Sequence, residues 1–314
     1  MTVSRSPSRP VALITGAAQG IGLLSARALA STHRVLLLDL NAAALADAVA
    51  SCGPDALGFC CDITQQGQVE AAVADAVRQA GAIDVLVSNA GIGTGCALRH
   101  TDPDVLAAQI NVNLVGNWRV IHACLPHLVA RRGYVLGVAS AAALVPAPVL
   151  GAYCASKAAL EMLLETLRIE VAHLGVEVGV AYPGFHDTEL VRKAEQFAPD
   201  FLLLRSRQPW PMNKVYPAEQ AAAAIAKAVR QRRRRVFAPG WIVWLSRLRM
   251  LLRTHTALAP ARQLAPALDA LGAARAAEQG ALAAAMTDTA AMRAAAASVG
   301  RVLNKPVAGY QARS

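Results

Sequence analysis

Short apolar runs alternate with stretches of helical periodicity from residue 11 to residue 184, and this alternation constrains the fold more than any other feature. The apolar runs are nearly continuous, as expected for strands that are covered on both faces. Strands that alternate with helices indicate parallel βαβ units and therefore a doubly wound α/β sheet. The strand candidates are VALITG (11–16), RVLLLDL (34–40), ALGFCCDI (56–63), DVLVSNAG (84–91), GYVLGVAS (133–140) and VEVGVAYPG (176–184).

The pattern changes at both ends and predicts one α/β domain with a helical C-terminal extension. Residues 1–9 form a polar leader that we expect to be flexible, and residues 10–240 hold the domain. Within it, residues 186–216 show little periodicity, and such a late irregular stretch is often a mobile lid over a site. PAEQAAAAIAKAV then predicts a helix with proline in its first turn, and RRRRVFAPG predicts an edge strand. Residues 241–314, which are apolar, basic and alanine-rich, predict the extension.

A glycine-rich turn, TGAAQGIG, follows the first strand candidate and opens a helix. Glycines at such a turn let the backbone approach a pyrophosphate, whose charge is stabilised at the helix N-terminus. The spacing is G-x-x-x-G-x-G, and taken alone it fits an ordinary turn about equally well. The candidate cofactor-binding residues of this turn are Gly16, Gln19, Gly20, Ile21 and Gly22.

An acidic residue at the end of the second strand strengthens the case for a dinucleotide. Asp39 follows Gly22 by seventeen residues, where a carboxylate can bind an adenosine ribose and repels a 2′-phosphate. No arginine or lysine follows at positions 40 and 41, so NAD(H) is favoured over NADP(H). Asp62 and Ile63, at the end of the third strand, are placed for the adenine edge. A helix N-cap is an equally good interpretation of Asp62.

Further polar and small residues stand near the ends of the later strands, which all face one crevice in an open α/β sheet. Ser140 closes the fifth strand candidate, and Asn113 lies in an otherwise apolar helix, NVNLVG. Tyr153 and Lys157, in YCASK, are four residues apart and therefore share one face of a helix. Taken alone, such a pair is more often a surface pair than a catalytic one. The SNAG stretch adds Asn89, Ala90 and Gly91.

Together, these motifs resemble the classical short-chain dehydrogenase/reductase (SDR) family over roughly residues 10–240. The family's T-G-x-x-x-G-x-G begins at Thr15, and its N-N-A-G reads S-N-A-G, with Ser88 as the departure. Its Y-x-x-x-K, its serine and its helix asparagine match the residues named above. Its P-G motif after the sixth strand adds Pro183, Gly184 and Thr188 to the cofactor-binding residues. The resemblance implies a Rossmann-like catalytic domain that binds NAD(P).

The resemblance also implies a role for each candidate catalytic residue. Tyr153 would be the general acid/base, and its ordinary pKa of about 10 is too high for this role near neutral pH. Lys157 and a positive nicotinamide ring would lower that pKa, and Lys157 would also bind the nicotinamide ribose. Ser140 would hydrogen-bond the substrate oxygen. Asn113 would hold a water that links Lys157 to solvent.

Two classes of function follow from this. The leading hypothesis is an NAD(H)-dependent oxidoreductase that interconverts a secondary alcohol and a ketone. The apolar stretch 190–204 and the apolar tail favour a lipophilic substrate of the steroid, retinoid or long-chain lipid type. The alternative is a non-catalytic NAD(H)-binding sensor or scaffold that acts through the tail. Its usual mark, a lost tyrosine, lysine or serine, is absent. No histidine has a partner at metal-ligand spacing, so no metal is expected. His186, in the P-G loop, could contact a substrate, but no role is assigned to it.

The positive charge is concentrated in one segment. The formal net charge is +10, and residues 230–275 hold ten arginines and one acid, Asp269. Apolar residues between 241 and 252 form one stripe on a helical wheel, as in basic helices that lie at membrane interfaces. The tail could therefore pack on its own domain or on a second subunit of a homo-oligomer, or contact a membrane surface through residues 230–256, or bind anionic ligands. Nucleic acid is disfavoured because no recognition module or aromatic platform accompanies RRRR.

We expect a cytoplasmic protein, with peripheral membrane association as an open alternative. The run VALIT is too short for a signal-peptide core or a membrane span. The six cysteines show neither disulfide nor metal-ligand spacing, which favours reduced thiols.

Overall fold

A parallel β-sheet forms the centre of the molecule. The computed structural model describes residues 9–93 and 95–283, and within them seven strands pair in the order β3-β2-β1-β4-β5-β6-β7. The order reverses between β1 and β4, which is where doubly wound sheets bind their ligands. The predicted Rossmann-like, doubly wound sheet is confirmed. The strands are β1 (Val11–Thr15), β2 (Arg34–Asp39), β3 (Leu57–Cys60), β4 (Val85–Ser88), β5 (Tyr134–Val138), β6 (Glu177–Pro183) and β7 (Arg235–Ala238).

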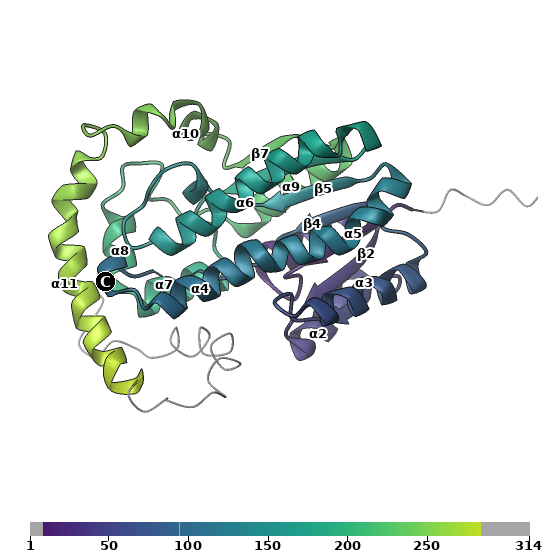
Figure 1. Cartoon of the computed structure of the whole chain (residues 1–314), viewed down its shortest axis with the longest axis horizontal. Coiled ribbons are helices and arrows are strands. Elements are labelled where there is room, and N and C mark those ends of the chain that lie inside the picture. Colours follow the sequence, from purple (N-terminus) through teal and green to yellow (C-terminus); the bar gives the residue numbers. More distant parts are fainter. Residues whose placement is uncertain (1–8, 94, 284–314) are drawn as a thin grey trace, which may run out of the picture.

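Helices cover both faces of this sheet (Figure 1). One apolar layer packs α1, α2 and α9 on the sheet, and the other packs α3, α5 and α6. Successive strand side chains point to opposite faces, so Leu13 belongs to one layer and its neighbours Ala12 and Ile14 to the other. This explains the continuous apolar runs. The helices are α1 (Gly20–Leu29), α2 (Ala42–Cys52), α3 (Gln66–Ala80), α4 (Pro103–Ile110), α5 (Asn117–Arg131), α6 (Gly151–Glu170) and α9 (Ala218–Gln231).

The stretch 186–216 is more regular than its sequence predicted. It contains two short helices, α7 (Glu189–Phe197) and α8 (Pro199–Ser206). The Thr188 hydroxyl caps α7 by accepting a hydrogen bond from the backbone N–H of Val191 at 3.4 Å. Pro199 occupies the first turn of α8, where its missing N–H costs nothing. Pro199 therefore marks a helix start inside this stretch.

The C-terminal extension packs against these two helices. After α10 (Ile242–Leu248), the long helix α11 (Ala259–Ala283) runs along one side of the domain beside α8 (Figure 1). Leu268 of α11 is buried with Phe201 and Leu204 of α8. Asp269 accepts hydrogen bonds from Arg99 at 2.9 Å and His100 at 2.8 Å. The predicted helical extension is confirmed to Ala283, whereas residues 284–314 and the leader residues 1–8 lie outside the described residues.

Candidate active site

The turn after β1 requires its glycines. Gly16 and Gly20 have φ angles of +62° and +56°, a region that side chains with a Cβ rarely adopt. A Cβ on Gly22 would collide with the carbonyl oxygen of Gly16. The turn therefore folds tightly and brings its backbone N–H groups to the N-terminus of α1, as an anion-binding site requires.

Contacts from the end of β4 hold this turn in place. The Asn89 amide donates to the carbonyl oxygens of Thr15 at 2.9 Å and Gly16 at 3.2 Å. The Thr15 hydroxyl accepts from the backbone N–H groups of Asn89 and Ala90, both at 2.9 Å. Ser88, the departure from the family's N-N-A-G, hydrogen-bonds Asn117 at 2.5 Å. Asn89 thus shapes the turn through its side chain, and Ser88 is accommodated by a partner on α5.

The two acidic candidates are both fixed by backbone hydrogen bonds. Asp39 accepts from the N–H groups of Ala18 at 2.9 Å and Asn41 at 3.0 Å, which ties the end of β2 to the glycine turn. Asp62 accepts from the N–H and the hydroxyl of Thr64, at 2.8 and 2.7 Å. Asp62 therefore closes a local turn ahead of α3, a structural role similar to the N-cap that the sequence also allowed. It lines the cleft described next as well.

A cleft runs along the carboxyl ends of the strands, and most predicted cofactor residues line it. Gly22 and Gly184 do not: Gly22 lies beneath the turn, and Gly184 faces a second pocket. The sequence did not single out Leu38, Ile92 and Val138, which also line the cleft because they sit at the same strand ends. The predicted residues that line it are Gly16, Gln19, Gly20, Ile21, Asp39, Asp62, Ile63, Asn89, Ala90, Gly91, Tyr153, Lys157, Pro183 and Thr188.

This arrangement fits a dinucleotide. One part of the cleft is a glycine turn at a helix N-terminus, which suits a pyrophosphate. Another part presents the Asp39 carboxylate, which suits a ribose hydroxyl. At the far part lie Tyr153 and Lys157. Within residues 9–93 and 95–283, no group of three His, Cys, Asp or Glu side chains could hold a metal ion.

Tyr153 and Lys157 project from the start of α6 toward the ends of β5 and β6. The Lys157 ammonium donates to the carbonyl oxygen of Val138 at 2.9 Å and lies 5.8 Å from the centre of the Tyr153 ring. Burial lowers the pKa of Lys157 to about 8. Burial also raises the pKa of Tyr153 to about 12, against an opposing hydrogen bond with Ser140. In the protein without its cofactor, burial is therefore the largest influence on the Tyr153 pKa, and the predicted lowering by Lys157 together with a nicotinamide ring stays a prediction.

Asn113 lies in a π-helical turn, η2 (Asn111–Gly116), between α4 and α5. Its side chain accepts from the N–H of Ile92 at 2.8 Å and donates to the Ile92 carbonyl at 2.8 Å and the Ser156 hydroxyl at 3.0 Å. Such turns occur frequently at functional sites. Ser156 was not predicted as a site residue, although its position between Tyr153 and Lys157 indicated that it lies near them. The water predicted at Asn113 stays a prediction.

A second pocket opens on the other side of Tyr153. Its walls come from the end of β5, the P-G loop, α7, α8 and α10, and they are largely apolar. Ser140 lines this pocket and not the cofactor cleft. The two cavities share part of their walls and therefore meet. The shared residues are Ile21, Tyr153, Pro183, Thr188 and Leu190.

His186, to which the sequence assigned no role, also lines this second pocket. The ring is buried, and Nδ1 donates to the carbonyl oxygen of Gly184 at 3.1 Å. Nε2 is buried and has no hydrogen-bond partner in the part of the chain that the structure describes. Burial lowers the pKa of His186, so a neutral ring would present Nε2 as an acceptor.

Known proteins match this chain in sequence and in fold. The sequence model of the family described as short chain dehydrogenase matches residues 10–198. The chain belongs to the short-chain dehydrogenase family. This confirms the resemblance drawn from the motifs and makes the protein an oxidoreductase with a nucleotide-binding Rossmann fold.

Individual relatives of this short-chain dehydrogenase are known in bacteria. It is 34% identical over 191 residues to 2-(R)-hydroxypropyl-CoM dehydrogenase of Xanthobacter autotrophicus, covering 58% of this chain and 76% of that protein. The crystal structure of a short chain dehydrogenase/reductase from Burkholderia phymatum in complex with NAD superposes with a TM-score of 0.68 at 27% identity, covering 78% and 94%. The 3-ketoacyl-(acyl-carrier-protein) reductase of Brucella melitensis complexed with NADH gives 0.65 at 28%, covering 71% and 92%.

Proposed function

We propose that this short-chain dehydrogenase interconverts a secondary alcohol and a ketone with NAD(H), with Tyr153 as the general acid/base. The observation that carries the proposal is the meeting of two cavities at Tyr153. One has the features of a dinucleotide site, and the other is an apolar pocket with Ser140 in its wall. A substrate in the second cavity would therefore contact the tyrosine beside a cofactor in the first.

The residues divide the work by their positions. NAD(H), when bound, accepts or supplies the hydride. The Tyr153 hydroxyl oxygen takes the alcohol proton on oxidation and returns one to the carbonyl oxygen on reduction. Ser140, which hydrogen-bonds Tyr153, orients the substrate oxygen. Lys157 binds the nicotinamide ribose and adds positive charge that favours the phenolate. Asn113 positions the start of α6 through Ser156.

We further propose NAD(H) as the preferred cofactor. Two backbone N–H groups fix the Asp39 carboxylate at the cleft, where it would accept from ribose hydroxyls and repel a 2′-phosphate. The two related structures contain NAD and NADH according to their descriptions, which supports the same preference.

The apolar pocket supports a lipophilic substrate of the steroid, retinoid or long-chain lipid type. Most of its wall is aliphatic or aromatic, with Phe185, Phe201 and Trp241 among the larger side chains. A bulky apolar substrate would bury more apolar surface there than a small hydroxy acid. The sensor or scaffold alternative gains no support, because Ser140, Tyr153 and Lys157 are all present and brought together.

We also propose that the enzyme is a cytoplasmic homo-oligomer. All six cysteines are free thiols, as is usual in a reducing compartment. Met162 and Ile169 of α6 are 64% and 75% exposed, and such exposed apolar side chains on one helix suit a subunit contact.

Turnover by a Tyr153→Phe variant tests the central proposal. NADH formation or consumption is measured across a panel of lipophilic and small polar alcohols and ketones. We expect kcat on the best substrate to fall by about 10²–10⁴-fold in the variant, because proton transfer contributes that much, while NADH affinity is kept. Tyr134→Phe is the matched control, since the Tyr134 hydroxyl donates to the backbone carbonyl oxygen of Arg233 and Tyr134 lines neither cavity. Undiminished turnover by Tyr153→Phe would refute the assignment, and absent NADH binding would refute the cofactor site.

A further inference from the structure

The outward face of α10 and of the short turn η5 (Leu251–Arg253) is apolar. Ile242 and Leu245 point inward and are 0% and 8% exposed. On the opposite side, at helical spacing, an ordinary surface helix would carry polar residues. Here the exposed residues are Trp244 at 57%, Leu248 at 43%, Met250 at 74% and Leu251 at 64%. We refer to these four residues as the outer apolar face.

The single stripe predicted from the sequence is therefore divided between two environments. Trp241 and Leu245 line the substrate pocket, and Leu252 packs on the core. Only Trp244, Leu248 and Leu251 of that stripe face outward, and Met250 joins them. One short segment thus forms a pocket wall on one side and an exposed apolar surface on the other.

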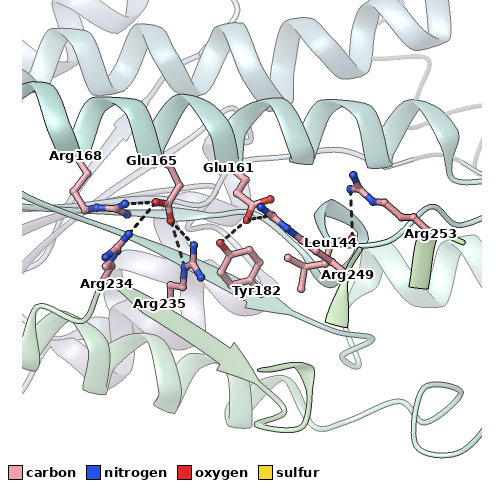
Figure 2. A network of polar contacts seen from close by, with 9 residues as sticks. All are labelled: Leu144, Glu161, Glu165, Arg168, Tyr182, Arg234, Arg235, Arg249 and Arg253. Atoms are coloured by element: carbon pink, nitrogen blue, oxygen red, sulfur yellow. Dashed lines mark hydrogen bonds and ion pairs between the residues drawn. The ribbon is translucent and has the colours of Figure 1, made fainter. Parts of the chain in front are cut away.

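Two arginines of this segment are held by a glutamate and a backbone carbonyl of the domain (Figure 2). Glu161 of α6 accepts from the Tyr182 hydroxyl at 2.9 Å and pairs with Arg249 at 3.4 Å. Arg253 donates to the carbonyl oxygen of Leu144 at 3.4 Å. Because two arginines hold the segment from its inner side, the outer apolar face is presented by an anchored structure.

The charge around this face is strongly positive. Residues 242–262 contain four arginines and no aspartate or glutamate. Glu165 already pairs with Arg168, Arg234 and Arg235, so the neighbouring acids are shared among more arginines than they can neutralise. Arg247 lies over the Trp244 ring at 5.2 Å and has no carboxylate partner in the described part of the chain.

We propose that the outer apolar face docks on the surface of an anionic lipid bilayer. Trp244, Leu248, Met250 and Leu251 would enter the boundary between headgroups and acyl chains, and the surrounding arginines would contact anionic headgroups. Charge decides against a second copy of the chain, because a symmetric contact would bring this basic surface against itself. Within the described residues no helix is long and apolar enough to span a bilayer, so docking would be at the surface. The proposal needs no turnover and stands apart from the enzymatic one.

Vesicle co-sedimentation of the full chain tests it. Vesicles of phosphatidylcholine alone are compared with vesicles that contain about 30% phosphatidylserine, at low and high salt. We expect binding to the anionic vesicles that weakens as salt screens the arginines. The double variant Leu248→Glu/Leu251→Glu should bind at least about tenfold more weakly, because it loses apolar burial and adds negative charge. Arg247→Gln should bind the anionic vesicles about threefold to fivefold more weakly, since one surface cation contributes about 1 kcal/mol.

Leu106→Glu/Leu174→Glu, at two exposed leucines outside residues 241–252, is the matched control and should bind as the wild type does. Thermal melting of all variants checks that they fold, which is expected because every substituted side chain is exposed. The proposal is overturned if the wild-type chain binds neither vesicle, or binds both equally. It is also overturned if the Leu248 and Leu251 substitutions change only the oligomeric mass, in which case a second copy covers the face.

Discussion

The cleft proposed for the cofactor and the apolar pocket proposed for the substrate meet at Tyr153 but are built in different ways. The cleft is shaped mainly by backbone geometry and short polar contacts, such as the bonds of Asn89 to the glycine turn. The pocket is shaped by apolar side chains from segments that are distant in sequence, including α8 and α10. These two helices lie beyond residues 10–198, where the family match ends. If the proposed function holds, the cofactor would be bound by segments that the family shares, and part of the substrate pocket would come from later segments.

The glycine turn offers the largest test of this contrast. Gly22→Ala should weaken NADH binding by more than about 100-fold, because the new methyl group collides with buried backbone and the turn must open. Gly67→Ala is the matched control: a Cβ on this α3 glycine meets nothing within 4 Å, so the change should leave NADH affinity as it is and slightly favour the helix. NADH fluorescence titration measures both. Tight binding by Gly22→Ala would show that backbone geometry does not limit this cleft.

Asp39→Asn tests whether the Asp39 carboxylate sets the preference for NAD over NADP. We expect the ratio of kcat/KM for NAD over NADP to fall by about 10- to 100-fold, since the repulsion of a 2′-phosphate is removed. The asparagine oxygen can still accept from Ala18 or Asn41, which preserves part of the present contacts. Steady-state kinetics with both cofactors give the ratio. An unchanged ratio would mean that other groups select the cofactor.

Leu268→Ala tests whether packing of α11 on α8 shapes the apolar pocket. Leu268 is 2% exposed and packs with Phe201 and Leu204, and Phe201 lines the pocket. The cavity left by the missing side chain should loosen α8 and raise KM for a large apolar substrate about fivefold to tenfold, while NADH affinity stays within about twofold. Leu106→Ala, at a 39% exposed leucine of α4, should change neither. Equal losses of substrate affinity and NADH affinity would show that the two cavities are not independent.

The sequence predicted the cofactor side better than the substrate side, for a physical reason. Glycine spacing and the four-residue interval from Tyr153 to Lys157 are local constraints, and the structure brings Gly16, Gly20, Tyr153 and Lys157 to one cleft. Their roles stay predictions. Long-range contacts leave no comparable local signal. The position of His186 in the pocket wall depends on the bond of its ring to Gly184 and on the path of the P-G loop.

Long-range contacts also determine the orientation of residues 241–252. A helical wheel for residues 241–252 gives one apolar stripe, but it cannot show that Glu161 and the Leu144 carbonyl lie opposite Arg249 and Arg253. These contacts rotate part of the stripe toward the pocket and part toward solvent. The short helices α7 and α8 were not predicted. The apolar spacing of α7 runs only through Leu190, Ala194 and Phe197, and Pro199 opens α8 directly after it.

The smallest expected effect concerns the charge network that anchors the pocket wall. Hydrogen bonding to Arg168, with Arg235 nearby, lowers the pKa of Glu165 to about 2, although burial opposes the shift. Because the folded-state pKa lies below its unfolded value, this stabilisation is present above about pH 4.5 and is lost as pH falls toward 2. Glu165→Gln should therefore reduce the free energy of unfolding by about 1–2 kcal/mol at pH 7, and the deficit should narrow below pH 4.5. Urea unfolding at pH 7, 5 and 4 measures it, and a constant deficit would mean that Glu165 acts through packing. Arg235 lies in β7, which leads directly into α10. Substrate binding in the apolar pocket should therefore weaken in acid before NADH binding does, because the cleft is shaped mainly by backbone contacts.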